Sequence, residues 1–183
     1  MSSVLFDPYA LFHVSEDSGI DNFHPRPPPS GDSGVRENVV WAIDHAHLPN
    51  YLTPRDCPRV TYGRGPQTTD EDAARFLTGT AGRIVTIEHA WLDRLISTPI
   101  YVYVFARGTT WRALPIGAGY FVSEKTERAV ECIRIDRPDQ AIFAQGSELR
   151  VRANLWNLID LVASSSLEFS IIRKRNAQPR CSG

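Results

Sequence analysis

Residues 100–105, Ile-Tyr-Val-Tyr-Val-Phe, constrain the fold of this chain more than any other stretch. Every side chain in it is β-branched or aromatic, which favours a β-strand. Because its apolar side chains would point to both faces of a sheet, the strand must be covered on both sides. The sequence therefore predicts a sheet with this strand in its interior.

Shorter apolar segments predict further strands and several short helices. The expected strands cover residues 11–15, 39–43, 60–62, 84–87, 117–123, 129–135, 148–152 and 167–172. The expected helices cover residues 45–48, 69–77, 90–96 and 136–144, and the segment that begins near Asn154. Strands dominate and do not alternate regularly with helices, which predicts an α+β fold. We expect a mixed or antiparallel split sheet with short flanking helices.

The length of 183 residues predicts a single domain over residues 1–183. A loop at 25–37, rich in Pro, Gly and Ser, is predicted to be flexible. The basic tail at 173–183 is predicted to be frayed, and Trp111, which follows Gly-Thr-Thr, is expected to be exposed.

Charge and composition argue against several classes of partner. The formal net charge is −1, so there is no strong signal for nucleic acid or an anionic membrane. No apolar run is long enough to span a bilayer, and the first ten residues lack the pattern of a signal peptide. Three widely spaced cysteines without a CxxC pair favour free thiols in a reducing compartment. We expect a cytoplasmic protein with no membrane partner.

His13 is the first candidate functional residue, because it lies inside the predicted strand at 11–15. One interpretation is a buried histidine that is hydrogen-bonded to a carbonyl group. The other is a neutral imidazole that donates to a ligand hydroxyl. Downstream, Arg26 is a candidate for binding a phosphate or carboxylate, although a solvated loop arginine explains it as well.

Other polar residues offer candidates with equally ordinary alternatives. Arg55 lies near further arginines and near Tyr51, which suits a nucleotide ligand or a solvated loop. Glu88 and Glu148 lie at strand ends, where a carboxylate can line a pocket, cap a helix or face solvent at a sheet edge. His45 and His47 form an H-x-H pair, but on a helix these side chains point apart, so no metal is expected.

Several segments together carry a resemblance. The chain has Leu-Phe-His-Val-Ser-Glu at 11–16, Phe-x-Pro-Arg at 23–26, Val-Trp-Ala-Ile at 40–43, Leu-Pro-Asn-Tyr-Leu-x-Pro-Arg-Asp-Cys-Pro-Arg at 48–59, Gly-Tyr-Phe-Val-Ser at 119–123 and a matching segment at 167–177. This resembles an uncharacterised family of small, mainly bacterial proteins that open with a Leu-(Phe/Tyr)-His-Val-Ser-Glu strand. The resemblance covers nearly the whole chain and implies no activity.

The opening is more distantly similar to the ADP-ribosyltransferase-like fold, which begins with an apolar strand ending in His or Arg. The resemblance implies that His13 binds a ribose of NAD and that Trp41 or Tyr51 stacks on nicotinamide. It also implies a glutamate that orients the reacting ribose. Glu148 is the first choice for that residue and Glu88 the second. Arg26 or Arg55 would then hold the pyrophosphate.

Two functions follow as hypotheses. The first is an NAD-dependent ADP-ribosyltransferase-like enzyme that cleaves the nicotinamide–ribose bond, with His13, Glu148 and Glu88 as catalytic candidates and the acceptor undefined. A fixed carboxylate would stabilise its oxocarbenium-like transition state. The alternative is a non-catalytic accessory protein that binds a small molecule or nucleotide in the same cleft.

Overall fold

The computed structural model describes residues 5, 7–28, 34–115 and 118–180. Contacts between Cα atoms group the chain into two compact units, each built from two segments. Unit 1 comprises Met1–Leu48 and Ile100–Ile135, and unit 2 comprises Pro49–Pro99 and Asp136–Gly183. Each unit has its own sheet and the helices are short, so the predicted α+β class is confirmed. The single domain and the ADP-ribosyltransferase-like arrangement stay predictions.

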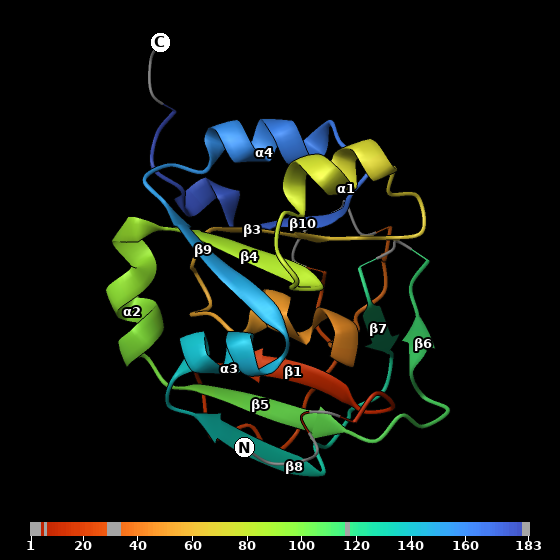
Figure 1. Cartoon of the computed structure of the whole chain (residues 1–183). Helices are drawn as coiled ribbons and strands as arrows, with labels where there is room; N and C mark the ends of the chain where they lie inside the picture. The colour runs from red at the N-terminus through yellow and green to blue at the C-terminus, as the bar shows by residue number, and fades with distance from the viewer. Residues whose placement is uncertain (1–4, 6, 29–33, 116–117, 181–183) are drawn as a thin grey trace. The chain divides into compact units, whose positions relative to one another are not determined.

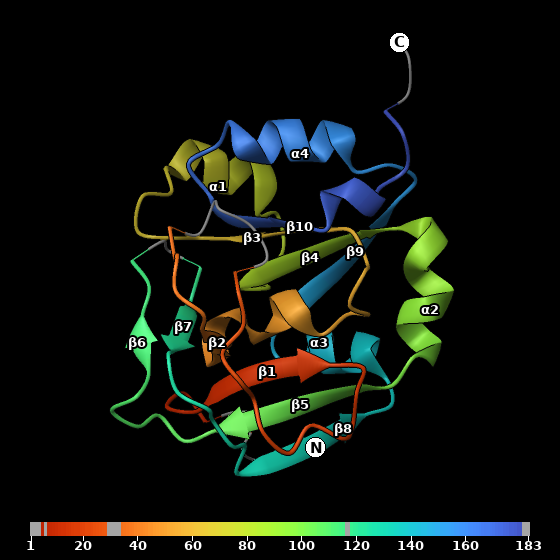
Figure 2. The same cartoon turned by 180° about the vertical axis from the view of Figure 1, so that it is seen from behind.

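Unit 1 contains a six-stranded antiparallel sheet with the strand order β6-β7-β2-β1-β5-β8 (Figures 1 and 2). Its strands are β1 (Leu11–Ser15), β2 (Val40–Asp44), β5 (Ile100–Phe105), β6 (Arg112–Ala113), β7 (Tyr120–Ser123) and β8 (Glu131–Ile135). β5 pairs with β1 on one side and β8 on the other, which confirms its predicted interior position. β6 was not predicted, because two residues are too few to show a pattern.

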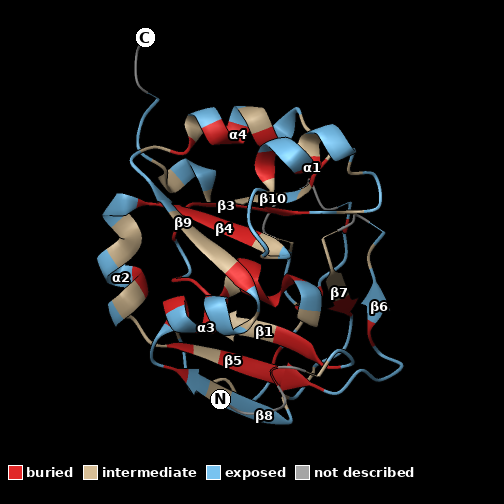
Figure 3. Ribbon diagram, viewed as in Figure 1, coloured by how far each residue is buried: buried red, intermediate tan, exposed pale blue. Residues whose placement is uncertain are grey.

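Aromatic side chains form the core on one face of the unit 1 sheet. Leu11 lies opposite Phe105 in the register of β1 and β5, and His13 lies opposite Tyr103. Trp111 packs against Phe105 and is only 9% exposed, so the expectation that it is exposed is wrong. A large indole within reach of an apolar face is stabilised by burial. In Figure 3, β5 is largely buried, whereas the edge strand β8 is mostly exposed.

Unit 2 contains a four-stranded sheet with the order β10-β3-β4-β9. Its strands are β3 (Arg59–Gly63), β4 (Arg83–Glu88), β9 (Ser147–Arg152) and β10 (Glu168–Ile172). β10, β3 and β4 are antiparallel, and β9 runs parallel to β4 at the edge. One antiparallel and one mixed sheet agree with the pattern expected from the sequence.

Two helices, α1 (Asp70–Phe76) and α4 (Trp156–Ala163), cover one face of the unit 2 sheet (Figures 1 and 2). Their apolar side chains pack against Val60, Tyr62 and Ile84. Thr69 Oγ1 accepts the Asp72 N–H at 3.2 Å, so α1 begins where the sequence predicted. The remaining helical segments are η3 (His45–Tyr51), η4 (His89–Trp91), α2 (Leu92–Ser97), α3 (Pro138–Ala144) and η5 (Lys174–Asn176).

The basic tail is anchored over residues 173–180, in contrast to the frayed tail expected at 173–183. Trp156 Nε1 donates to the Gln178 carbonyl at 2.7 Å. Arg180 makes two hydrogen bonds to Asp160, at 2.8 and 2.9 Å, and its guanidinium lies over the Trp156 ring. The expectation fails because these partners are distant in sequence. Residues 181–183 lie outside the described residues.

The loop at 25–37 is described only in part. Arg26 and Val39 form an antiparallel bridge with backbone hydrogen bonds of 3.1 and 3.0 Å. Residues 29–33 lie outside the described residues, so the flexibility of this loop stays a prediction. Within the described part of the chain, we find no helix with the length and apolar character needed to cross a membrane.

Candidate functional site

The residues predicted to form one ligand site are divided between the two units. Unit 1 holds three of them: His13, Arg26 and Trp41. Unit 2 holds the other four: Tyr51, Arg55, Glu88 and Glu148. Their joint role in one site stays a prediction.

The imidazole of His13 is held in one orientation by a backbone carbonyl. Its Nδ1 lies 3.0 Å from the Trp41 oxygen. Because a carbonyl oxygen only accepts, Nδ1 carries a proton, and in a neutral ring Nε2 is then an acceptor. The ring is half-buried and meets Phe23 edge-on, with 5.0 Å between ring centroids. The hydrogen bond to a carbonyl group that the first interpretation expected is therefore present. It leaves Nε2 of a neutral ring as an acceptor, whereas the second interpretation expected the imidazole to donate to a ligand hydroxyl.

The Trp41 indole and the His13 imidazole do not share a face of the sheet. Leu11 lies opposite Asp44 and Phe12 opposite Ile43, and side chains alternate along each strand. The Trp41 side chain therefore points to the face opposite to that of His13. Its ring meets the Tyr120 ring edge-on, with 5.6 Å between ring centroids. Two cavities of unit 1, with volumes of about 260 and 320 Å³, are lined by residues other than His13.

Glu88, at the end of β4, has a structural role. It is 0% exposed, and its carboxylate accepts the Leu155 N–H at 3.2 Å. It also accepts the Gln178 N–H, at 2.9 and 3.2 Å from its two oxygens. Leu155 is the residue before α4, so Glu88 caps α4 and anchors the tail. The sequence suggested a cap for the following helix, but the side chain makes no such bond to η4.

Glu148 is an accessible carboxylate that an arginine holds in place. Arg150 donates to it twice, at 2.7 and 3.2 Å, and also donates to the Tyr62 hydroxyl at 3.0 Å. The hydrogen bonds from Arg150 lower the pKa of Glu148, so the carboxylate is ionised at neutral pH. Its side chain is 35% exposed on the edge strand β9.

Tyr51 and Arg55 lie on the connection that leads to β3. The Arg59 guanidinium lies 5.4 Å from the centre of the Tyr51 ring and donates to the carbonyls of Asn50 and Cys57. Arg59 is thus a buried structural residue. Arg55 is exposed, and its backbone oxygen accepts from Arg173 Nε at 3.2 Å.

Asp44 and His47 form a hydrogen-bonded pair that the sequence reasoning missed. Asp44 Oδ1 accepts the His47 backbone N–H at 3.0 Å and its ring Nδ1–H at 2.7 Å. A carboxylate that orients an imidazole is also the arrangement of general-base histidines. The available signal was the Asp-x-x-His spacing at the end of the second strand, of which we interpreted only the histidines, as an H-x-H pair. Among the described residues, no group of three His, Cys, Asp or Glu side chains could hold a metal ion.

The Asp44–His47 pair predicts a change in acid stability. Burial raises the pKa of Asp44, but the hydrogen bonds from His47 outweigh it and leave the pKa below the ordinary value. Stability from a lowered carboxyl pKa is present above the unfolded value and is lost as the pH falls through the folded one. We expect Asp44→Asn to destabilise the protein by about 1–2 kcal/mol at neutral pH, and by less below about pH 4. Urea unfolding of both proteins across this pH range measures the loss of stability. A loss that does not change with pH would contradict the prediction.

A family model with the description "family of unknown function" matches residues 12–177. This range includes every predicted site residue, from His13 to Glu148. No curated protein and no solved structure matches the chain.

Proposed function

The chain belongs to this family of unknown function, DUF6886, and since membership assigns no activity, we propose that the protein binds a ribose-containing nucleotide through His13. NAD is the first candidate ligand. The observation that supports this proposal is the single orientation of a half-buried imidazole, which the Trp41 carbonyl holds at 3.0 Å.

The chemistry of recognition follows from the tautomer of His13. With the proton on Nδ1, the Nε2 atom of a neutral ring accepts a hydrogen bond, and each ribose hydroxyl is a donor. The ligand hydroxyl would compete there with the other contacts that His13 makes in the unliganded protein. Because the ring is already positioned, little ordering of the site is needed on binding.

Binding without turnover is the function that the carboxylates support best. A catalytic carboxylate has to face the charge that develops on the ribose. Glu88 instead caps α4, and Glu148 is held by Arg150. Glu88 is fully buried, and both oxygens of the more exposed Glu148 already accept a hydrogen bond from Arg150. The structure of these two side chains therefore favours an accessory binding protein.

Calorimetry with NAD tests this proposal. We expect binding at or below millimolar concentrations, and at least tenfold weaker binding by the His13→Ala variant. His24→Ala is the matched control, because His24 is exposed and bonds only to Thr126 among the described residues. Thermal unfolding of both variants separates lost binding from lost folding. No detectable NAD binding by the intact protein, or equal affinity in the His13 variant, would rule the proposal out.

A transferase is the second candidate, and the ionised, accessible Glu148 carboxylate favours it. In that reaction the bond between nicotinamide and ribose breaks, nicotinamide leaves with the bonding electrons, and an acceptor nucleophile or water attacks the ribose carbon. We expect the intact protein to release nicotinamide from NAD. The Glu148→Gln variant should release it at least a hundredfold more slowly and still bind NAD. NAD binding without any release of nicotinamide would leave the accessory function and exclude the transferase.

A further inference from the structure

The tail segment, Gln178–Arg180, lies beside the start of α4 in the way that a bound peptide lies on a receptor (Figures 1 and 2). Three side chains of unit 2 hold its backbone. The N–H of its first residue donates to Glu88 at 2.9 Å, and the carbonyl of that residue accepts from Trp156 Nε1 at 2.7 Å. The carbonyl of its second residue accepts from Asn154 Nδ2 at 3.0 Å. These contacts recognise an extended main chain.

Arg180 supplies the side-chain recognition. Its guanidinium donates twice to Asp160, at 2.8 and 2.9 Å, and lies 4.4 Å from the centre of the Trp156 ring. Trp156 and Asp160 are four residues apart on α4, so they share a face of the helix. A carboxylate beside an aromatic ring matches the planar, forked guanidinium and matches the ammonium group of lysine less well. The site therefore selects arginine.

The residue before Arg180 keeps the tail segment extended. Pro179 fixes its own φ and restricts Gln178 to extended conformations. Ala177, directly before the segment, is also extended, with φ −68° and ψ 154°. A chain of this kind loses little conformational freedom on binding, which is why proline-containing peptides are recognised at aromatic surfaces. The matching ligand is therefore Pro-Arg preceded by a residue that has an N–H.

The site does not depend on the tail segment for its shape. Asn154 Oδ1 accepts the Trp156 N–H at 2.9 Å, which leaves Nδ2 to donate to a peptide carbonyl. Trp156 is half-buried and packs against the core of unit 2. The Leu155 N–H holds Glu88 at 3.2 Å. These groups therefore keep their positions when the segment leaves.

The tail segment is held specifically but with little burial. All three of its residues are exposed, and the side chains of Arg180 and Asp160 are each 55% exposed. Ion pairs that face water contribute little to stability, because solvent screens them. Segments with few buried apolar contacts open at a low free-energy cost. The tail segment therefore has the features of a displaceable ligand.

We propose that Glu88, Asn154, Trp156 and Asp160 form a site for an extended Pro-Arg peptide of a partner protein, which the tail segment occupies in the free chain. Because the segment is tethered, its effective concentration at the site is on the order of millimolar. A partner must therefore displace it by making additional contacts. A second copy of the chain would bring the same three residues, so exchange would add no contact here and would cost the freedom of two molecules.

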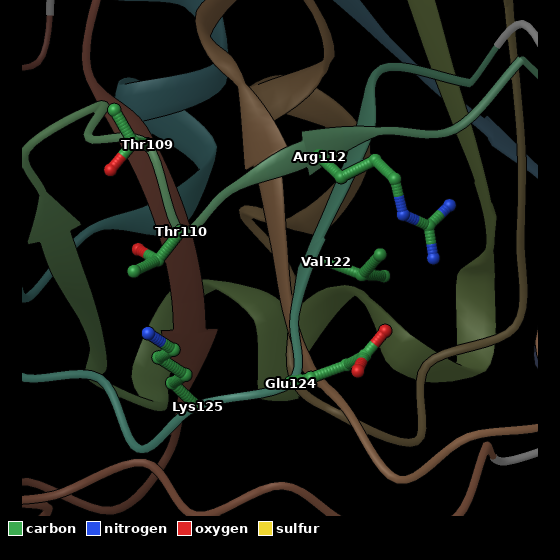
Figure 4. Close-up of a pocket in the computed structure, with 6 residues that line it drawn as sticks. All are labelled: Thr109, Thr110, Arg112, Val122, Glu124 and Lys125. Carbon is green, nitrogen blue, oxygen red and sulfur yellow. The ribbon is translucent and has the colours of Figure 1, made fainter.

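This site is independent of the one proposed at His13. All of its residues belong to unit 2, whereas His13 belongs to unit 1. None of them lines either of the two cavities of unit 1 described above, of which Figure 4 shows the smaller. Failure of nucleotide binding at His13 would therefore leave the peptide site unaffected, and the reverse also holds.

A full chain whose tail segment is released tests the proposal. Gln178→Pro removes the N–H that Glu88 accepts, and Arg180→Ala removes the guanidinium that Asp160 binds. A proline is tolerated after Ala177, because that residue is already extended. Thermal unfolding confirms that this double variant is folded, and the single variant Arg180→Ala serves if it is not.

The probe is the acetylated, amidated peptide Asn-Ala-Gln-Pro-Arg, which is the sequence of residues 176–180. In calorimetry, we expect the double variant to bind this peptide saturably and at least tenfold more tightly than the intact chain, whose own segment competes. The single variant should gain severalfold. The Trp156 indole N–H signal in nuclear magnetic resonance spectra should shift on binding. Replacing the arginine of the peptide by lysine should weaken binding at least tenfold.

Matched variants separate this site from general attraction of a cationic peptide. In the double variant, Asp160→Asn should weaken binding at least tenfold, whereas Asp93→Asn, at an exposed carboxylate elsewhere in unit 2, should not. Arg175→Ala in the intact chain should leave peptide binding as weak as before. No saturable binding by the folded variants, equal affinity for the arginine and lysine peptides, or equal losses at the two aspartates would overturn the proposal. A dimer of the intact chain that Asp160→Asn abolishes would also overturn it, in favour of exchange between copies.

Discussion

Replacing Gly119 by alanine is expected to destabilise the protein by about 3 kcal/mol or more, from backbone strain and overpacking together. Gly119 has a φ of +66°, which non-glycine residues rarely adopt. A β-carbon there would lie 2.1 Å from His47 Nδ1 and 2.6 Å from Asp44 Oδ1. The backbone also cannot withdraw freely, since the Asp44 N–H donates to the Gly119 carbonyl at 2.9 Å. Alanine must therefore displace the Asp44–His47 pair.

Urea unfolding measures this loss, and Gly146→Ala is the matched control. Gly146 has a φ of +68°, but a β-carbon there would meet nothing within 4 Å. Substitution of Gly146 by alanine should cost only the backbone strain, about 1–2 kcal/mol. Similar losses at the two glycines would show that the close approach to Asp44 and His47 contributes nothing. The double variant Gly119→Ala, Asp44→Asn should lose less than the sum of its parts, because the sites are in contact.

The second large effect is expected for Glu88→Ala. The substitution leaves the N–H groups of Leu155 and Gln178 without their acceptor, at about 1–3 kcal/mol for each unsatisfied donor that stays buried. We expect a loss of about 3 kcal/mol, or somewhat less where water reaches Gln178. Glu88→Gln keeps one carbonyl acceptor and should lose less than the alanine variant.

Thermal and urea unfolding check this prediction, and hydrogen exchange at the Leu155 and Gln178 amides locates the effect. Glu71→Ala is the control, because Glu71 is an exposed residue in the first turn of α1 and should cost no more than about 1 kcal/mol. A Glu88→Ala protein of unchanged stability that has lost nicotinamide release would refute the capping role. It would instead support the catalytic role that the sequence suggested for Glu88.

The elements of the fold were predictable where the signal is local. The β-branched and aromatic composition of 100–105 placed β5 in the interior of a sheet, and the Thr69 cap with its acidic turn placed the start of α1. These features depend on residues within a few positions of each other, so composition and spacing reveal them. β6 has two residues and is stabilised by its pairing with β7, so no local pattern in the sequence predicts it.

The candidate site shows the opposite case. Glu88 reads in sequence as a carboxylate at a strand end, and nothing near it indicates that its partners are Leu155 and Gln178, 67 and 90 residues away. Trp111 lies in a polar loop and is buried only because Phe105 is within reach. In each case the role of a polar or aromatic side chain depends on what the folded chain brings next to it.

By itself, the sequence determined the α+β class, the strand segments other than β6 and the presence of a histidine in the first strand. Tertiary structure alone decided that the His13 ring bonds to the Trp41 carbonyl, that Glu88 caps α4, and that Arg180 meets Trp156 and Asp160. The physical reason is range: strand and helix preferences act between near neighbours, whereas hydrogen-bond partners and cavities arise from segments that meet only after folding.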